Sequence, residues 1–396
     1  MNSDSPTPHL KTSDFALFDI AFRPFFLCGS VFSLCAILIW AGLFSGNLTI
    51  NVFGGGLWWH THEMLFGFVC AIIMGFLLTA VQNWTSQKSI SHTPLFALVL
   101  LWLSARLALL SPSGLPTWLI SFLDISFIPI ATFFFIRPII KVKLWRNLIF
   151  LPLLTALTIV NIAMHYSVYT GNVSIIFPAS KIAVLLVAMI MTIMGGRVIP
   201  MFTANGTGTK KVNELKWLEK SAISSLLLVI IFNAGLIELP NTINALLFFI
   251  TAIFHFIRVI RWRFWVTLRT HLVWSLHLSY AFIPTGLGLL GVSQLSDAIS
   301  TSQAIHTITV GAIGLMILSM ISRVSLGHTG RKIQTGKLMA CAFLILFCAA
   351  LIRILGQLFT DDYIFIILCS AVLWALAYCI FVVVYTPILI RKRIDQ

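Results

Sequence analysis

Twelve long apolar segments follow one another along this chain of 396 residues. Each has about the 20 residues that an α-helix needs to cross the hydrocarbon core of a bilayer. Hydrophobic residues make up 59% of the sequence and charged residues 10%, which excludes an ordinary soluble domain. The segments are residues 25–44, 57–81, 94–111, 116–137, 147–168, 176–199, 219–237, 241–260, 271–290, 300–322, 337–358 and 363–390. The sequence therefore predicts an all-α, polytopic integral membrane protein with about 12 transmembrane helices.

The connections between these segments are too short to hold a soluble domain. We expect a short cytoplasmic N-terminal segment at residues 1–24, a single membrane domain at 25–390 and a basic cytoplasmic tail at 391–396. The first 22 residues are polar and lack an apolar core, so a cleavable signal peptide is not predicted.

The net charge of +14 would suit a nucleic-acid-binding protein, but the bases are placed as a topology signal. When the loops are taken in alternation, one set and the two termini hold every Lys and Arg except Arg106, Lys181 and Arg353. Cytoplasmic loops of membrane proteins are enriched in Lys and Arg. We therefore expect both termini in the cytoplasm, and the lipid bilayer rather than nucleic acid as the partner.

Ionisable side chains inside the apolar segments are the next signal, because they are costly in a bilayer and usually serve a site. At a rise of about 1.5 Å per residue, one group falls in the non-cytoplasmic half of several different segments. It comprises His60, His62, Glu63, Arg106, Asp124, His165, Lys181, His306 and Arg353. We expect a buried polar site in this layer.

A smaller pair lies nearer the cytoplasmic face. His255 and His277 are on adjacent antiparallel segments and could face each other. Two such imidazoles could bind a haem axially or simply make structural hydrogen bonds.

The motif Trp58-Trp59-His60-Thr61-His62-Glu63 opens the second segment. On a helix, His60 and His62 point about 200° apart, whereas His60 and Glu63 share a face. Glu63 could therefore orient His60 while His62 faces a different partner. Alternatively, an irregular helix start after Gly54-Gly55-Gly56 could bring both imidazoles together. In a third interpretation the histidines make only interhelical hydrogen bonds.

The same H-x4-G spacing joins His62 to Gly67 and His306 to Gly311. A glycine one turn beyond a histidine would let a neighbouring helix or a flat macrocycle approach closely.

Two other residue types are interpreted as structural. The seven cysteines lie inside the apolar segments without a C-x-x-C motif, which favours packing over disulfides or a thiolate metal site. The tryptophans at segment ends are expected to be interfacial anchors, namely Trp58, Trp59, Trp84, Trp262 and Trp265.

Six blocks, in this order and spacing, resemble the NnrS family of polytopic membrane proteins. They are Phe22-Arg23-Pro24-Phe25-Phe26, Trp59-His60-x-His62-Glu63-Met64-Leu65-Phe66-Gly67-Phe68, residues 75–85 (GFLLTAVQNWT), residues 195–203 (GGRVIPMFT), His306-x3-Val310-Gly311-Ala312-Ile313-Gly314, and residues 323–331 (RVSLGHTGR). The resemblance implies a bacterial inner-membrane protein that contains haem and copper and takes part in the response to nitric oxide and nitrosative stress. It names neither the electron partner nor the ligands.

Carried over to matching positions, the resemblance makes His60, His62, Glu63 and His306 the leading cofactor candidates, with His60, His62 and His306 as candidate metal ligands. His165 joins them by its depth, and Arg106 and Arg353 could pair with haem propionates or with Asp124. Further matched residues at the cytoplasmic ends are Arg197, Arg323 and His328. Contact with lipid phosphates accounts for these three as well as a functional role does.

Three functions stay open from the sequence. The first is a haem and copper protein that binds nitric oxide or protects the cell from its products. The second is a transporter of a metal, a nitrosyl complex or a small anion. The third is a nitric-oxide-consuming haem–copper enzyme, which would need His60, His62, His165 and His306 close together.

Overall fold

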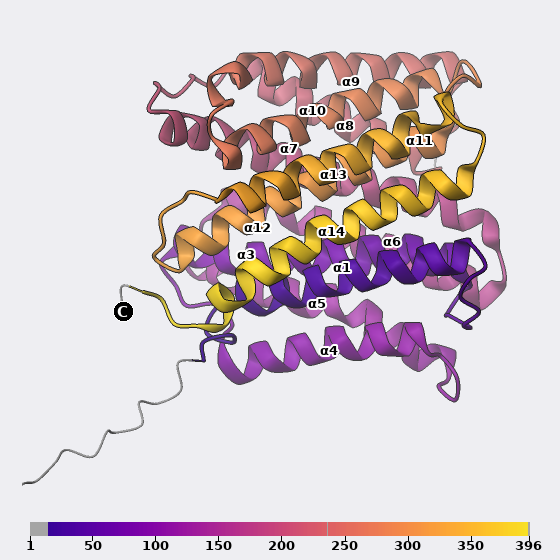
Figure 1. Ribbon diagram of the computed structural model, residues 1–396, viewed down its shortest axis with the longest axis horizontal. Coiled ribbons are helices and arrows are strands. Elements are labelled where there is room, and N and C mark those ends of the chain that lie inside the picture. Colours follow the sequence, from indigo (N-terminus) through magenta and orange to yellow (C-terminus); the bar gives the residue numbers. More distant parts are fainter. Residues whose placement is uncertain (1–14, 236, 395–396) are drawn as a thin grey trace, which may run out of the picture.

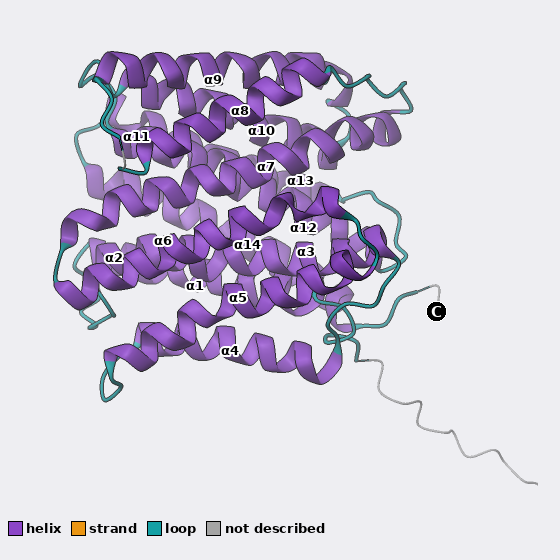
Figure 2. Cartoon of the chain, turned by 180° about the vertical axis from the view of Figure 1, so that it is seen from behind, coloured by secondary structure: helices purple, strands orange, loops and turns teal. Residues whose placement is uncertain are grey.

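The computed structural model describes residues 15–235 and 237–394, and its regular structure is helical (Figures 1 and 2). The α-helices are α1 (Phe22–Phe44), α2 (Gly56–His62), α3 (Cys70–Thr85), α4 (His92–Leu110), α5 (Thr117–Lys141), α6 (Phe150–Thr170), α7 (Ile176–Thr207), α8 (Lys216–Asn233), α9 (Asn241–Arg261), α10 (His271–Val292), α11 (Thr301–His306), α12 (Leu315–His328), α13 (Lys337–Leu355) and α14 (Tyr363–Ile390). Two π-helices, η1 (Glu63–Val69) and η5 (Thr307–Gly314), join α2 to α3 and α11 to α12. Short 3-10 helices are η2 (Trp145–Ile149), η3 (Val173–Ile175), η4 (Phe264–Thr267) and η6 (Gly356–Leu358).

The all-α membrane fold predicted from the sequence is confirmed. Eleven helical segments are long and apolar enough to cross a bilayer. The remaining expected segment forms α8, which has 18 residues and begins with a charged stretch. Phe15 and Arg391 form an antiparallel bridge, so the two ends of the described chain lie on the same side. An arrangement with both ends on one side needs an even number of crossings, so we expect α8 to be the twelfth.

The helices lie side by side in one bundle, with α4 at one edge and α9 at the other (Figure 1). The first and last helices, α1 and α14, pack against each other. The buried face of α1 includes Gly29, Ser33 and Ala36, and such small residues let two membrane helices approach closely. The indole of Trp374 on α14 donates a hydrogen bond to Ser33 at 2.8 Å. The N-terminal residues 1–14 of the expected cytoplasmic segment lie outside the described residues.

Arg23 connects the two ends of the described chain, although from the sequence it was counted among the bases of the N-terminus. It is 2% exposed, and its Nη1 donates to the carbonyl oxygens of Leu389 at 2.8 Å and Arg391 at 2.5 Å. Leu389 lies in the last turn of α14 and Arg391 directly follows the helix, where carbonyl groups have no partner within the helix.

We expect Arg23→Leu to lower the free energy of unfolding by about 2–3 kcal/mol, because hydrogen bonds from a charged donor are lost. Thermal unfolding of the purified protein in detergent measures this. The exposed Arg137 gives a matched control, and Arg137→Leu should unfold like the wild type. Equal losses in the two variants would show that Arg23 holds nothing in place.

Arg258 was also assigned to a basic cytoplasmic loop, and that prediction is wrong. The structure places it in α9 with no exposed surface. Its guanidinium donates to the two oxygens of Glu219 on α8, at 3.1 and 2.7 Å, and to the carbonyl of Thr192 at 3.0 Å. A buried guanidinium needs such a partner, which explains why the apolar α8 carries a carboxylate in its first turn.

Candidate functional site

The layer of ionisable residues predicted from the sequence is divided into two sites by the structure. One, called here the polar cluster, consists of His62, Glu63, Arg106, Asp124, Asn161 and His165. The other, called the main cavity, is lined by His60, Lys181, His306 and Arg353 among mostly apolar residues. His60 and His62 lie on the same short helix but serve different sites.

The polar cluster joins four segments of the bundle. His62 ends α2 and Glu63 begins η1, Arg106 comes from α4, Asp124 from α5, and Asn161 and His165 from α6. The exposed fraction of each of these side chains is 3% or less. Polar groups this deeply buried must satisfy one another, since water cannot reach them.

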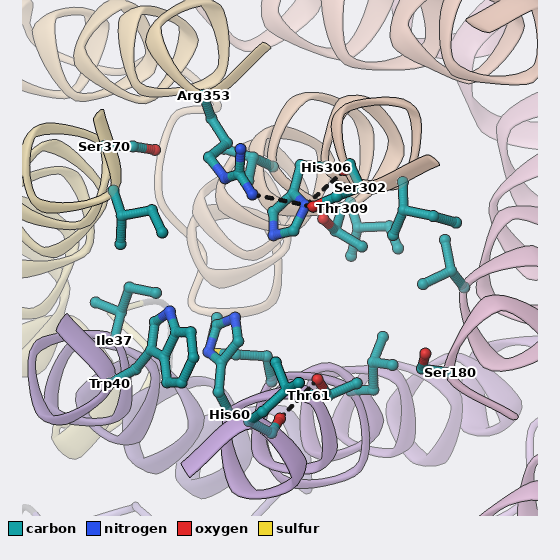
Figure 3. Close-up of a pocket in the computed structure, with 18 of the residues that line it drawn as sticks. Ile37, Trp40, His60, Thr61, Ser180, Ser302, His306, Thr309, Arg353 and Ser370 are labelled. Carbon is teal, nitrogen blue, oxygen red and sulfur yellow. Dashed lines mark hydrogen bonds between the residues drawn. The ribbon is translucent and has the colours of Figure 1, made fainter. Parts of the chain in front are cut away.

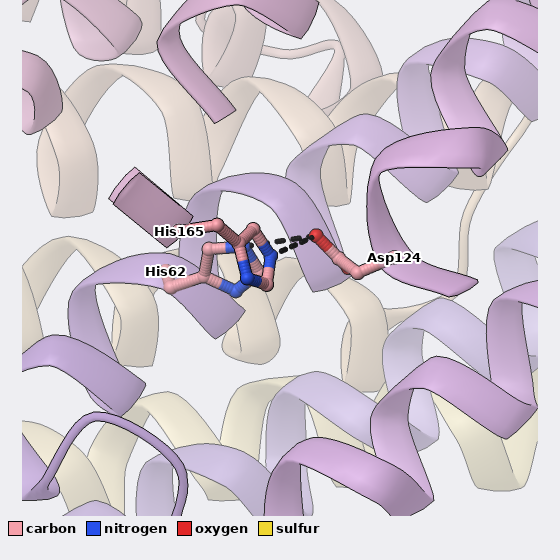
Figure 4. Close-up of side chains that lie close together, drawn as sticks. All are labelled: His62, Asp124 and His165. Atoms are coloured by element: carbon pink, nitrogen blue, oxygen red, sulfur yellow. Dashed lines mark hydrogen bonds and ion pairs between the residues drawn. The ribbon is translucent and has the colours of Figure 1, made fainter. Parts of the chain in front are cut away.

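Asp124 is the centre of the polar cluster (Figure 4). Its Oδ2 lies 3.0 Å from Nε2 of His62 and 3.0 Å from Nε2 of His165. The side-chain amide of Asn161 donates to the same oxygen at 2.8 Å. The other carboxylate oxygen, Oδ1, accepts a hydrogen bond from Arg106.

In both imidazoles the other ring nitrogen, Nδ1, also contacts a side-chain oxygen. Nδ1 of His62 lies 3.1 Å from Oε1 of Glu63, which also accepts a 2.7 Å hydrogen bond from Arg106. Nδ1 of His165 lies 3.0 Å from the hydroxyl of Ser121. Histidines that bind metals almost always have an oxygen partner on the nitrogen that does not bind the metal.

The charges of the polar cluster do not balance within it. Glu63 and Asp124 carry two negative charges when ionised, and Arg106 carries one positive charge. If His62 donates its Nδ1 proton to Glu63, the lone pair on its Nε2 faces the oxygens of Asp124 and Asn161, the latter at 2.8 Å. These atoms would repel one another without a cation between them. The arrangement therefore calls for one further positive charge, which a proton on His62 or on one of the two carboxylates, or a metal ion, would supply.

The geometry can accommodate a metal ion. One ligand atom from each of His62, Asp124 and His165 lies within 4.8 Å of the others, and all three residues are buried. Two imidazoles and one carboxylate suit Cu(II) or Fe(II) better than a soft, thiolate-seeking ion. From the sequence, His165 and Asp124 were expected in the same buried layer and His62 was predicted to be a metal ligand.

The indole of Trp58 covers the polar cluster from one side. It stacks on the His62 ring with centroids 4.4 Å apart and planes 8° apart, and its Nε1 donates to the carbonyl of Met164 at 2.9 Å. Gly54 (φ +71°) makes room for it, since a Cβ there would lie 2.6 Å from the indole. Trp58 and Trp59 are each 1% exposed, so the prediction that they are interfacial anchors is wrong.

The main cavity has a volume of about 560 Å³ and lies between α1, α2, α7, α11, α13 and α14. This volume is within the range of small-molecule and cofactor sites. His60 projects into it from α2 and His306 from the facing side (Figure 3). Apolar side chains such as Phe68, Leu65 and Val310 make up much of the remaining wall.

The two histidines of the main cavity, His60 and His306, differ in the hydrogen bonding of Nδ1. Nδ1 of His306 lies 2.7 Å from the carbonyl oxygen of Ser302, so it must carry the proton that it donates. The lone pair of His306 is then on Nε2, where a ligand can use it. His60 stacks on Trp40 with centroids 4.4 Å apart and planes 10° apart, while its buried Nδ1 has no hydrogen-bond partner among the described residues.

Two cationic side chains also line the main cavity. Arg353 of α13 donates through Nη2 to Ser302 at 3.1 Å (Figure 3). The same nitrogen donates to the hydroxyl of Tyr363 at 2.7 Å. The buried Nη1 of Arg353 has no hydrogen-bond partner among the described residues. Lys181 of α7 donates to Asn233 at 2.9 Å. An apolar slot with cationic groups on its wall suits an amphipathic, anionic ligand.

Both interpretations that linked His60 directly to its motif neighbours are wrong. Glu63 bonds to His62 and Arg106, not to His60, and the helix start does not bring the imidazoles of His60 and His62 together. The paired glycines also have a different role from the expected one. A Cβ on Gly67 would lie 2.5 Å from Arg106, and one on Gly311 would lie 2.5 Å from Phe282. Each of these glycines makes room for a single neighbouring side chain, and not for a whole helix or a macrocycle.

The pairing suggested for His255 and His277 is also wrong. His255 contacts the hydroxyl of Tyr280 at 2.9 Å, whereas His277 contacts the hydroxyl of Thr203 at 2.7 Å. Each histidine thus has its own partner, and the interpretation as structural hydrogen bonds describes them better than an axial haem pair.

The three matched residues at the other end of the bundle make local contacts. Arg197 donates to Asn147 at 3.0 Å, and Arg323 lies over the ring of Phe202 at 3.8 Å. His328 packs against Phe22 with ring centroids 5.5 Å apart. None of these contacts reaches the polar cluster or the main cavity.

The four histidines proposed for an oxidase-like centre are divided into two pairs, His62 with His165 and His60 with His306. Sequence reasoning missed Asn161, Ser121, Trp40 and Trp58 as partners of these pairs. Asn161 could have been found, because an amide in the middle of an apolar segment is itself a signal of a buried polar site.

Comparison with known proteins supports the resemblance seen in the motifs. No match was found among curated proteins. The family model described as NnrS protein matches residues 16–393, which is nearly the whole chain. The chain therefore belongs to the NnrS family.

Proposed function

We propose that this protein carries a haem in the main cavity and a copper ion in the polar cluster, and that it acts in the response to nitric oxide. The observation that carries the proposal is the pair of imidazoles, His60 and His306, directed into one mostly apolar cavity with cationic groups at its wall. We place the protein in the bacterial inner membrane with both termini in the cytoplasm, because the basic loops lie on that side.

The residues of the main cavity fit a haem. The plane of a haem needs an apolar slot and one or two axial ligands. His306 offers Nε2 with its tautomer fixed by Ser302, and His60 offers a second nitrogen from the facing side. The unpartnered Nη1 of Arg353 is available to a propionate.

The residues of the polar cluster fit a copper ion. His62 and His165 would hold it through Nε2 and Asp124 through Oδ2, while Glu63 and Ser121 fix the two imidazoles. When bound, haem supplies an iron that binds nitric oxide, and copper supplies a one-electron redox centre. The protein holds both in place and excludes water from the polar cluster.

The test is an absorption spectrum of protein purified from haem-replete cells, taken after oxidation, after reduction with dithionite and after exposure to nitric oxide. We expect a Soret band that shifts at each step, with copper in the same sample. A featureless spectrum from protein that still complements a deletion strain would refute the haem and favour the transporter.

Metal analysis separates the two sites. We expect one copper per chain in the wild type and loss of that copper in His165→Gln, because one of three ligands is removed. Ser121→Ala should weaken copper binding by about tenfold or more, since it removes the hydrogen-bond partner of a ligand.

The exposed His92 supplies the control for adventitious copper, and His92→Gln should keep the metal. His60→Gln should also keep it, because His60 lies in the main cavity. Iron in place of copper, or full copper in His165→Gln, would contradict the assignment.

A further inference from the structure

A second, smaller cavity of about 90 Å³ lies beside the main cavity. Its walls come from α1, α3, α7, α10, α12 and both π-helices, and every lining residue is apolar. Met194 and Val198 of α7 and Met320 of α12 are lining residues that are only half-buried.

The two cavities share part of their walls. Val69 and Ile313 line both of them. Val69 is the last residue of η1 and Ile313 lies in η5, so both π-helices contribute to the partition. A π-helical turn is rare and is found mostly at functional sites. Two such segments meeting at one partition mark it as a built feature rather than a packing defect.

The chemistry of the smaller cavity restricts what can occupy it. A buried water molecule needs two to four polar partners, and these walls offer none. An ion or a hydrogen-bonding solute would lose its hydration without compensation. Apolar cavities of about 150 Å³ stay dry and bind benzene or xenon, and a space of 90 Å³ suits smaller molecules of that kind.

We propose that the smaller cavity is a binding site and passage for small uncharged gas molecules, such as nitric oxide, and that it leads past Val69 and Ile313 into the main cavity. Such gases are apolar and partition into the hydrocarbon of the membrane. Met194, Val198 and Met320 are half-buried, so the partly exposed residues of this wall are themselves apolar. The assignment of the gas as a cofactor ligand rests on the function proposed above, whereas the gas site itself does not.

Xenon tests the site without any cofactor. Crystals of the full-length protein pressurised with xenon should show anomalous density among Met191, Ile317 and Val69. Ile317→Phe should abolish this density, because the added ring fills the space. Val372→Phe, on the lipid-facing side of α14 with 55% exposure, should leave it unchanged. Absence of xenon from the wild-type cavity would overturn the proposal.

Carbon monoxide recombination after flash photolysis tests the passage in haem-loaded protein. Val69→Phe should slow the bimolecular phase by about fivefold, since the added ring fills space at the wall that the two cavities share. Val372→Phe should recombine at the wild-type rate. An unchanged rate in Val69→Phe would overturn the passage. A colourless protein that still takes up xenon would refute the proposed haem but not the gas site.

Discussion

Arg106→Met is expected to lower the free energy of unfolding by about 3–5 kcal/mol, the usual result of removing one partner from a buried ion pair. Arg106 is 3% exposed and bonds to both Glu63 and Asp124. Without it, the two carboxylates face each other in a region that water does not enter. Unfolding in mixtures of mild detergent and SDS, followed by tryptophan fluorescence, measures the change.

A double variant separates the charge from the lost packing. Arg106→Met with Glu63→Gln removes one positive and one negative charge, so the net charge of the polar cluster returns to its original value. It should recover more than half of the lost stability. If the single variant unfolds like the wild type, or if Glu63→Gln gives no recovery, Arg106 does not neutralise these carboxylates.

The sequence predicted the helical membrane fold because the apolar segments are long and separated by polar loops. It was less accurate where a charged residue is buried near a segment end. Arg23 was counted among the bases of the N-terminus and Arg258 among those of a loop, because of their positions along the chain. Their burial depends on partners far away in sequence, the end of α14 for Arg23 and Glu219 of α8 for Arg258.

The ionisable residues expected in one layer lie in the polar cluster or line the main cavity, but depth along each segment could not divide them between these two sites. Grouping depends on the rotation of each helix about its axis. The regular α2 helix sends His60 and His62 to different sites, as the angle between them predicted. The change to a π-helix at Glu63 alters the rotation of every later residue. A pairing of Glu63 with His60, inferred from regular spacing, therefore fails.

The two sites differ in size and polarity, and this difference suits two different kinds of ligand. The polar cluster is closed, and its hydrogen bonds leave a place for one cation. The main cavity is large and apolar, and its histidines have free nitrogens. A closed site suits a small ion that is held permanently, whereas a large apolar site suits a cofactor that must also admit a ligand.

His306→Ala is expected to reduce the Soret absorbance of purified protein by about tenfold, as expected when a metal-binding group is lost. If a haem occupies the main cavity, the fixed tautomer of His306 would make it the stronger ligand of the two histidines. His60→Ala should retain haem but change the spectrum from that of a six-coordinate to that of a five-coordinate iron. The haem content per chain of each variant is measured as the pyridine haemochrome and compared with that of the wild type.

Added imidazole distinguishes lost ligation from a damaged fold. In His306→Gly, free imidazole should enter the space left by the side chain and restore the Soret band. His328→Ala, which alters a histidine at the far end of the same transmembrane segment, should retain full haem. Full haem in both His306→Ala and His60→Ala would show that the main cavity is not the haem site. The smaller cavity would then be a gas site that does not lead to a haem.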